Sequence, residues 1–339
     1  MDGPPETRNP PTVAAVEGSE TSDFGKRLNR YGTAKRYTRD VMQALGPARA
    51  KRMGIQSPVL VLQCGDWLRF RDYYTVGQVK LVAASFCKKH LVCGLCAIRR
   101  ASRLMASYLE RFQVIRKADP ALRPWLVTLT VRNSHDLPEV LAHLLRSLRT
   151  LHRRRSRKNQ PSVMHGIAGG VYSVELTYDE RTGWHPHVHA IWLAASDPGT
   201  FKLRHEWEQI TGDSFMCDVR RIHAEEGVPD DIDPHAGGFA ECFKYAMKPA
   251  ELGPELLEQA YPVLRGKRLV GSFGAFRGVP EPESYADDLA GLDALPYEEF
   301  LARFVSGAYL RSDHANRSSV HRELPRPGRS DGRTAARPL

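Results

Sequence analysis

The sequence predicts an α+β fold in which helices cover one face of an antiparallel sheet. Two observations carry this prediction. First, the neighbouring segments 171–178 and 184–192 alternate apolar and polar side chains with the period of two that a half-buried strand shows. Second, segments with strand and helix periodicity follow one another in the order β-α-β-β-α-β-α, which is typical of a ferredoxin-like or split βαβ arrangement.

The other elements of this sheet follow from local patterns. Residues 125–131 form a predicted strand, and Ser134 or Asp136 then caps a helix whose leucines recur at helical spacing to Leu151. Further elements are expected as a helix at 200–210, a strand at 215–222, a helix after Gly237-Gly238, a helix and hairpin within 252–277 (hairpin 267–277), and an acidic helix at about 283–304.

Composition favours a partner that is a polyanion. The 339-residue chain has a formal net charge of +10, and arginine heavily outnumbers lysine. Guanidinium groups match phosphate oxygens, although basic tails on an ordinary soluble protein would give the same balance. No apolar run approaches the roughly 18 residues that cross a bilayer, so we expect a cytoplasmic protein without membrane contact.

Five regions are predicted along the chain. They are a disordered tail (1–24), a basic helical and four-cysteine zinc-binding region (25–112), a catalytic domain (113–250), C-terminal helices and a hairpin completing that domain (251–309), and a disordered basic tail (310–339).

The cysteines of the second region predict a small zinc-binding module. Cys93 and Cys96 form a CxxC turn, and Cys64 and Cys87 lie shortly upstream, which completes the four thiolates of a structural zinc site. His90 is an alternative ligand for one of them. The competing interpretation is four buried apolar cysteines.

The strand at 184–192 carries three histidines on one face, a pattern that suits a metal ion. If the loop before it spans three or five residues, Glu175 of the preceding strand lies opposite His187. We therefore expect Glu175, His187 and His189 to bind a metal, with His185 as a polar neighbour or fourth ligand. The alternative is that histidines alternate here by chance.

A later helix carries Glu241, Tyr245 and Lys248 on one stripe, at spacings of four and three residues. Such a stripe is usually an amphipathic surface. Its place one helix after the histidine strand makes it a candidate site.

Together these motifs resemble the HUH endonucleases, in particular the single-tyrosine initiators of rolling-circle plasmid replication. The resemblance rests on the strand 126–130, the run Trp184-His-Pro-His-Val-His-Ala-Ile, the pattern Glu241-x-x-x-Tyr245-x-x-Lys248 and the upstream cysteines. It implies an HUH fold and a nickase: a magnesium or manganese ion held by His187, His189 and an acid polarises the scissile phosphate, and Tyr245 attacks it.

The same resemblance implies a 5'-phosphotyrosine link, a free 3'-hydroxyl that primes synthesis, and a water activated by Glu241 at termination. The implied partners are plasmid origin DNA, single-stranded or as a hairpin, and a host helicase and polymerase. Alternatives are an HUH transposase or mobilisation relaxase, a non-catalytic zinc-containing DNA-binding regulator, and a metal-dependent hydrolase of a small substrate.

Overall fold

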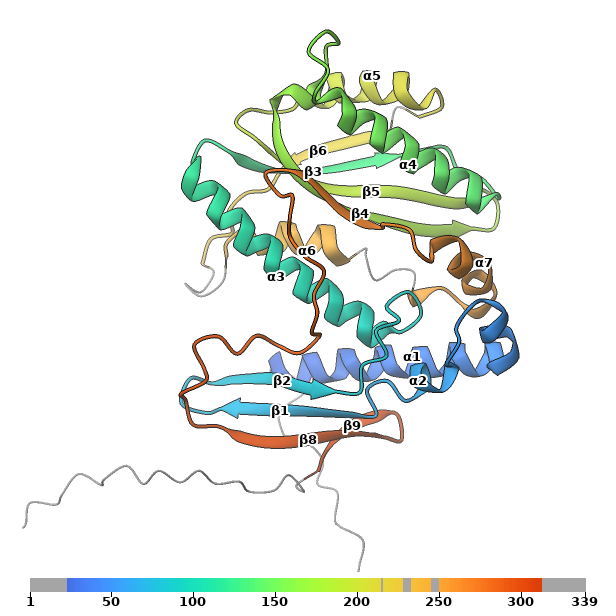
Figure 1. The fold of residues 1–339 in the computed structure, drawn as a ribbon, viewed down its shortest axis with the longest axis vertical. Coiled ribbons are helices and arrows are strands. Elements are labelled where there is room, and N and C mark those ends of the chain that lie inside the picture. Colours follow the sequence, from blue (N-terminus) through green and yellow to red (C-terminus); the bar gives the residue numbers. More distant parts are fainter. Residues whose placement is uncertain (1–22, 215, 228–232, 245–249, 313–339) are drawn as a thin grey trace, which may run out of the picture.

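The computed structural model describes residues 23–214, 216–227, 233–244 and 250–312. It confirms the predicted α+β class and contains two antiparallel sheets, one of five strands and one of four. In Figure 1 the five-stranded sheet lies at the top and the four-stranded sheet at the bottom, with helices α1 (Asp23–Arg52) and α3 (Gly94–Ala118) between them. Within the described ranges, no helix combines the length and the apolarity needed to cross a membrane.

The five-stranded sheet has the strand order β6-β3-β5-β4-β7. Its strands are β3 (Arg123–Thr130), β4 (Ile167–Asp179), β5 (Gly183–Ala194), β6 (Cys217–Arg221) and β7 (Val270–Gly274). The three central strands alternate as the sequence predicts. Val127, Val174 and Val188 are buried on one face, while His187 and His189 project from the other.

Helices α4 (Leu137–Arg154) and α5 (Thr200–Thr211) cover the apolar face of this sheet (Figure 1). Helix α4 begins where Asp136 caps it, because the Asp136 carboxylate accepts a hydrogen bond from the Glu139 amide at 2.9 Å. The predicted leucine stripe is buried against the sheet, with Leu144 and Leu151 fully enclosed. A 3₁₀ turn, η1 (Val163–Gly166), leads from α4 into β4.

Two further helices pack on part of the histidine face. Helices α3 and α6 (Ala236–Lys244) lie over Val171, Ile191 and Leu193 and form a second core with them. The apolar side chains of this face therefore lie under helices, at one end of the strands. The histidine end of the same face carries polar side chains instead, which leaves it available for a ligand.

The four-stranded sheet was not predicted from the sequence. Its order is β2-β1-β8-β9, and it combines segments from both ends of the described chain. The strands are β1 (Trp67–Tyr73), β2 (Gln78–Ala84), β8 (Glu298–Val305) and β9 (Ala308–Ser312). Helix α1 packs on one face of this sheet, where Leu68, Phe70 and Phe300 are buried.

Two expectations for the C-terminal part were wrong. The acidic helix expected at 283–304 is instead a segment of turns followed by strand β8, because pairing with β1 decides its conformation. The hairpin expected at 267–277 is the single edge strand β7, which pairs with β4. Helices α2 (Pro58–Leu62) and α7 (Pro254–Leu264) complete the described elements.

The expected inner boundaries of the two terminal tails fall inside described elements, α1 and β9. Strand β9 runs to Ser312, beyond the expected start of the tail at residue 310. Residues 1–22 and 313–339 lie outside the described part of the chain, so the two predicted tails are described only in their last and first few residues.

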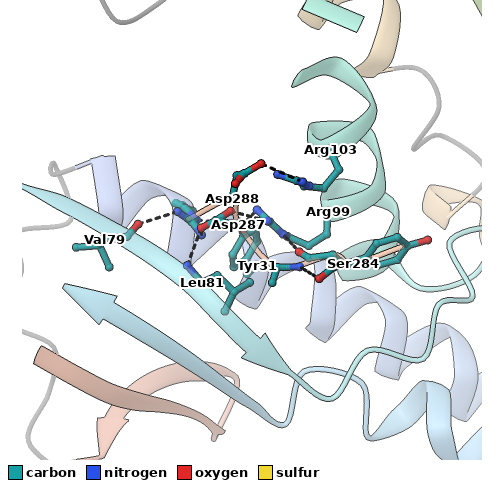
Figure 2. A network of polar contacts seen from close by, with 11 residues as sticks. Tyr31, Val79, Leu81, Arg99, Arg103, Ser284, Asp287 and Asp288 are labelled. Atoms are coloured by element: carbon teal, nitrogen blue, oxygen red, sulfur yellow. Dashed lines mark hydrogen bonds and ion pairs between the residues drawn. The ribbon is translucent and has the colours of Figure 1, made fainter. Parts of the chain in front are cut away.

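A partly buried ionic network ties the segment before β8 to α1, α3 and β2 (Figure 2). The Asp287 carboxylate accepts hydrogen bonds from Arg27 at 2.5 Å, Arg99 at 2.5 Å and the Leu81 amide at 2.6 Å. Arg99 also donates to the Tyr31 hydroxyl at 2.9 Å. Burial would raise the pKa of Asp287, but the charges of Arg99 and Arg27 outweigh it and hold that pKa below its usual range.

Candidate active site and metal centres

The hairpin of β4 and β5 has the register that the sequence predicts. Three residues, 180–182, connect the strands, and Tyr178 pairs with Trp184 while Glu175 pairs with His187. Gly183 ends the turn with φ +82°, and a Cβ there would lie 2.6 Å from the Ser134 carbonyl group. Only glycine meets both conditions, so this position fixes where the histidine strand begins.

Glu175, His187 and His189 converge into one group at the polar end of the histidine face, where Glu175 and His189 are buried and His187 is half-buried. The Nε2 atoms of both histidines lie against Oε2 of Glu175, at 2.9 Å for His189. The potential ligand atoms of all three residues lie within 4.8 Å of one another. Thr128 Oγ1 lies 3.3 Å from Nδ1 of His189, which orients that ring with Nε2 toward Glu175.

The electrostatics of this group suit a cation. Burial would raise the pKa of Glu175, but hydrogen bonds from His187 and His189 outweigh it and lower the pKa to about 2. Glu175 is therefore a carboxylate near neutral pH. A carboxylate and two imidazoles fill only part of the coordination sphere of a divalent ion, so substrate oxygens have room to bind there.

His185 lies beside this group and not within it. Its ring centroid is 5.1 Å from that of His187, and its side chain lines a neighbouring open pocket of about 430 Å³ together with Thr130 and Arg132. Burial and the neighbouring His187 lower the pKa of His185. The structure therefore places it where the sequence allowed a polar neighbour.

Helix α6 holds the predicted Glu241 close to the sheet. Ser173 donates a hydrogen bond to the Cys242 carbonyl at 2.5 Å, and the Cys242 thiol donates to the His189 carbonyl at 3.4 Å. Burial raises the pKa of Cys242 to about 12, which keeps it a thiol. Glu241 accepts a hydrogen bond from Lys244 at 2.5 Å. Sequence patterning did not single out Ser173 or Cys242, because neither belongs to a ligand motif.

Two predicted site residues, Tyr245 and Lys248, lie outside the described residues. Helix α6 is described to Lys244, the residue directly before Tyr245. The described part of the site thus comprises the ligand group and the helix that precedes the tyrosine in the chain.

A second ligand group lies where the turn after α2, the segment after β2 and the start of α3 meet. The four predicted cysteines converge there, with sulfur–sulfur distances of 3.5 Å between Cys64 and Cys96 and 3.7 Å between Cys87 and Cys96. A zinc tetrahedron with bonds of about 2.3 Å has sulfur–sulfur edges of about 3.8 Å, so these positions fit zinc. His90, the alternative ligand, is not in the group.

The surroundings of the sulfur group favour negative charge on some of its members and oppose it on others. Cys93 caps α3 and Cys96 lies in its first turn, where the helix dipole is positive. The Cys87 amide donates to Cys64 Sγ at 3.4 Å, and hydrogen bonds from Cys64 and its neighbours lower the pKa of Cys87. The same neighbours raise the pKa of Cys93, so a full set of thiolates requires a cation.

Comparison with known proteins gives the family. Residues 78–301, more than half of the chain, match the family model Rep_1, described as replication protein. Similar curated proteins are each named Protein rep. One from Lactiplantibacillus plantarum is 27% identical over 201 residues, which is 56% of this chain and 60% of that protein. One from Bacillus amyloliquefaciens is 28% identical over 277 residues, which is 73% of this chain and 78% of that protein.

A third relative, from a Bacillus species, is 27% identical over 135 residues, 39% of this chain and 41% of that protein. The chain thus spans less than two thirds of the length of two of these relatives. No solved structure matches the chain. The resemblance to replication initiators is confirmed at the level of the family, and the chain belongs to the Rep_1 family of replication proteins.

Proposed function

We propose that this protein initiates rolling-circle plasmid replication by nicking one strand of its origin. The observation that carries the proposal is the convergence of Glu175, His187 and His189 on the sheet face on which α6 packs. The family match supports a role in replication, and the basic composition supports a DNA substrate. The expected substrate is origin DNA that is single-stranded or folded as a hairpin.

The ligand group would hold a magnesium or manganese ion, whose positive charge offsets charge on the scissile phosphate. Tyr245 is the proposed nucleophile. Its phenolic oxygen forms a bond to phosphorus, and the bond from phosphorus to the 3'-oxygen breaks. The phenol loses its proton, the 3'-oxygen gains one, and the products are a 5'-phosphotyrosine and a 3'-hydroxyl primer for the host polymerase and helicase.

The other residues of the stripe take supporting roles in this proposal. Glu241 accepts a proton from water when the covalent link is released. Lys248 adds positive charge near the phosphate. The four-cysteine group would hold zinc and act only on folding, because four protein ligands leave no position for a substrate.

The test is cleavage of a labelled origin strand with manganese present. Wild type should form a covalent 5'-linked adduct whose peptide contains Tyr245, and Tyr245→Phe should lose cleavage while keeping DNA affinity. Tyr178→Phe is the matched control, because that tyrosine lies on the other face of β4. An adduct on Tyr172, Tyr178 or Tyr261 would refute the assignment. Binding without any nicking would instead indicate a regulator.

A further inference from the structure

The four-stranded sheet presents a second surface, which we call the outer face. Helix α1 covers the opposite face, and no other described helix packs on the outer one (Figure 1). Because side chains alternate along a strand, β1 directs Trp67, Arg69 and Arg71 to the outer face, while Leu68 and Phe70 are buried under α1. This surface belongs to a different sheet from the proposed nicking site.

Neighbouring strands add two cations to this face. Arg303 of β8 pairs with Trp67, and Lys80 of β2 pairs with Arg71, so both lie on the outer face. Trp67 is 36% exposed, and the side chain of Arg69 is 44% exposed. The Trp67 ring is therefore partly accessible to solvent beside arginine side chains of two strands.

A second aromatic group lies at the other end of β1. The Arg71 guanidinium lies 4.3 Å from the centroid of the Tyr297 ring, and Tyr297 is 41% exposed. Tyr297 also packs against Tyr73 of β1, with ring centroids 5.4 Å apart. Tyr73 itself is buried, so the accessible groups of the outer face are Trp67, Arg69 and Arg71 along about 13 Å of β1, with the Tyr297 ring beside Arg71.

The charge of this surface selects an anionic partner. Four cations (Arg69, Arg71, Lys80 and Arg303) share it with one acid, Glu299, which lies 3.2 Å from Arg71 and 3.7 Å from Arg69. One carboxylate leaves an excess of positive charge on the face. Cations interleaved with aromatic rings along an open sheet are the combination that binds a phosphate backbone and stacks its unpaired bases.

We propose that the outer face binds single-stranded DNA at a site separate from the nicking site. Stacking on Trp67 requires bases whose faces are free, so a single strand fits this surface and a paired duplex does not. The strand displaced during replication has this chemistry. The site would let the protein hold DNA while the first sheet carries out cleavage.

The experiment measures binding of the full chain to a fluorescent oligothymidylate of 20 nucleotides. This strand contains no origin sequence, and no divalent ion is added, so neither origin recognition nor cleavage contributes to the measured affinity. Trp67→Ala should weaken binding about tenfold, as loss of one stacked base predicts. Arg69→Gln with Arg303→Gln should lower the slope of log affinity against log salt by about 1.4. Oligothymidylate should also quench tryptophan fluorescence in wild type but not in Trp67→Phe.

The matched control is Lys51→Gln with Arg52→Gln, which removes two exposed charges from the end of α1. It should bind like wild type, and all variants should nick a short origin oligonucleotide at the wild-type rate. The proposal would be overturned if the variants of Trp67, Arg69 and Arg303 bound oligothymidylate with wild-type affinity and if fluorescence quenching in Trp67→Phe equalled that of wild type. It would also be overturned by an equal loss in the control pair, an equal loss for duplex DNA, or a parallel loss of nicking of the short substrate.

Discussion

The two candidate metal groups of this protein differ in their ligands and in how the chain brings those ligands together. The sulfur group has four soft ligands, from the turn after α2, the segment after β2 and the start of α3, and it fits a closed tetrahedron. The group of Glu175, His187 and His189 is buried to a similar degree, but its three ligands come from one hairpin and fill only part of a coordination sphere. The hairpin is set by local register, whereas the sulfur group exists only once distant segments have come together.

From this difference we infer that the sulfur group would stabilise the fold and that the histidine group would serve chemistry. A group assembled from distant segments contributes its binding energy to folding, because the unfolded chain has no such site. A group on one hairpin adds little to folding, since the sheet holds its ligands in place without an ion. Variants that remove one group at a time can therefore separate the two roles.

Loss of the sulfur group should cause the largest change in stability. Cys93→Ser removes one ligand and should lower the free energy of unfolding by at least about 5 kcal/mol, because structural zinc sites contribute apparent energies of about 10–16 kcal/mol. Elemental analysis and urea denaturation measure the two effects. Cys217→Ser, a half-buried cysteine outside the group, should keep both zinc and stability. A variant without zinc that unfolds like wild type would show that the sulfur group does not stabilise the fold.

Loss of the histidine group should affect cleavage and leave the fold nearly unchanged. His187→Ala or His189→Ala should reduce origin nicking at least about a thousandfold, since the lost cation stabilises several kcal/mol of developing charge. Thermal melting of the same variants should shift by only a few degrees. His185→Ala, beside the group, is the matched control and should retain most activity. Full cleavage by His189→Ala in excess chelator would contradict the assignment.

The histidine hairpin was predictable because its information is local. An alternating pattern and a short turn fix the register between Glu175 and His187, and a CxxC turn identifies the sulfur group in the same way. The relation of Ser173 and Cys242 to His189 was not predictable, because it depends on how α6 docks on the sheet.

The second sheet was missed because its pairing is not local. Phe70 of β1 pairs with Phe300 of β8, and more than 200 residues separate them in the sequence. Residues 298–305 are rich in glutamate, alanine, leucine and arginine, which favour helix, so propensity pointed the wrong way. The alternation of Leu68 and Phe70 with Trp67, Arg69 and Arg71 was the signal that a strand was present.

The junction between the two sheets should be sensitive to the charge of Asp287. Asp287→Asn leaves Arg99 buried without its carboxylate and should cost about 3 kcal/mol at pH 7. Because the folded pKa is depressed, the stabilisation is present above the unfolded value of about 3.9 and is lost as pH falls through the folded pKa.

Urea midpoints at pH 7 and pH 3 check this prediction, and the gap between wild type and variant should narrow at the lower pH. Asp288→Asn is the control, because that side chain is 61% exposed and lies 3.6 Å from Arg103. An unchanged gap between the two pH values would mean that Asp287 acts through packing and not through charge.

Substitution of Glu241 should have the smallest effect on nicking and should act only at the later step, release of the covalent adduct. It therefore tests whether residues outside the group of Glu175, His187 and His189 take part in the reaction. Its carboxylate is partly exposed and paired with Lys244, so it adds nothing to the ligand group itself. Glu241→Ala should therefore nick within about twofold of wild type, while release of the covalent adduct slows about a hundredfold through loss of a general base. Lys244→Ala, which removes the partner and keeps the carboxylate, should release the adduct nearly normally. Equal slowing of nicking and release in Glu241→Ala would instead place the carboxylate in the first chemical step. Cleavage would then depend on Glu241 as well as on the ligand group, and Glu241 would not be a base for release alone.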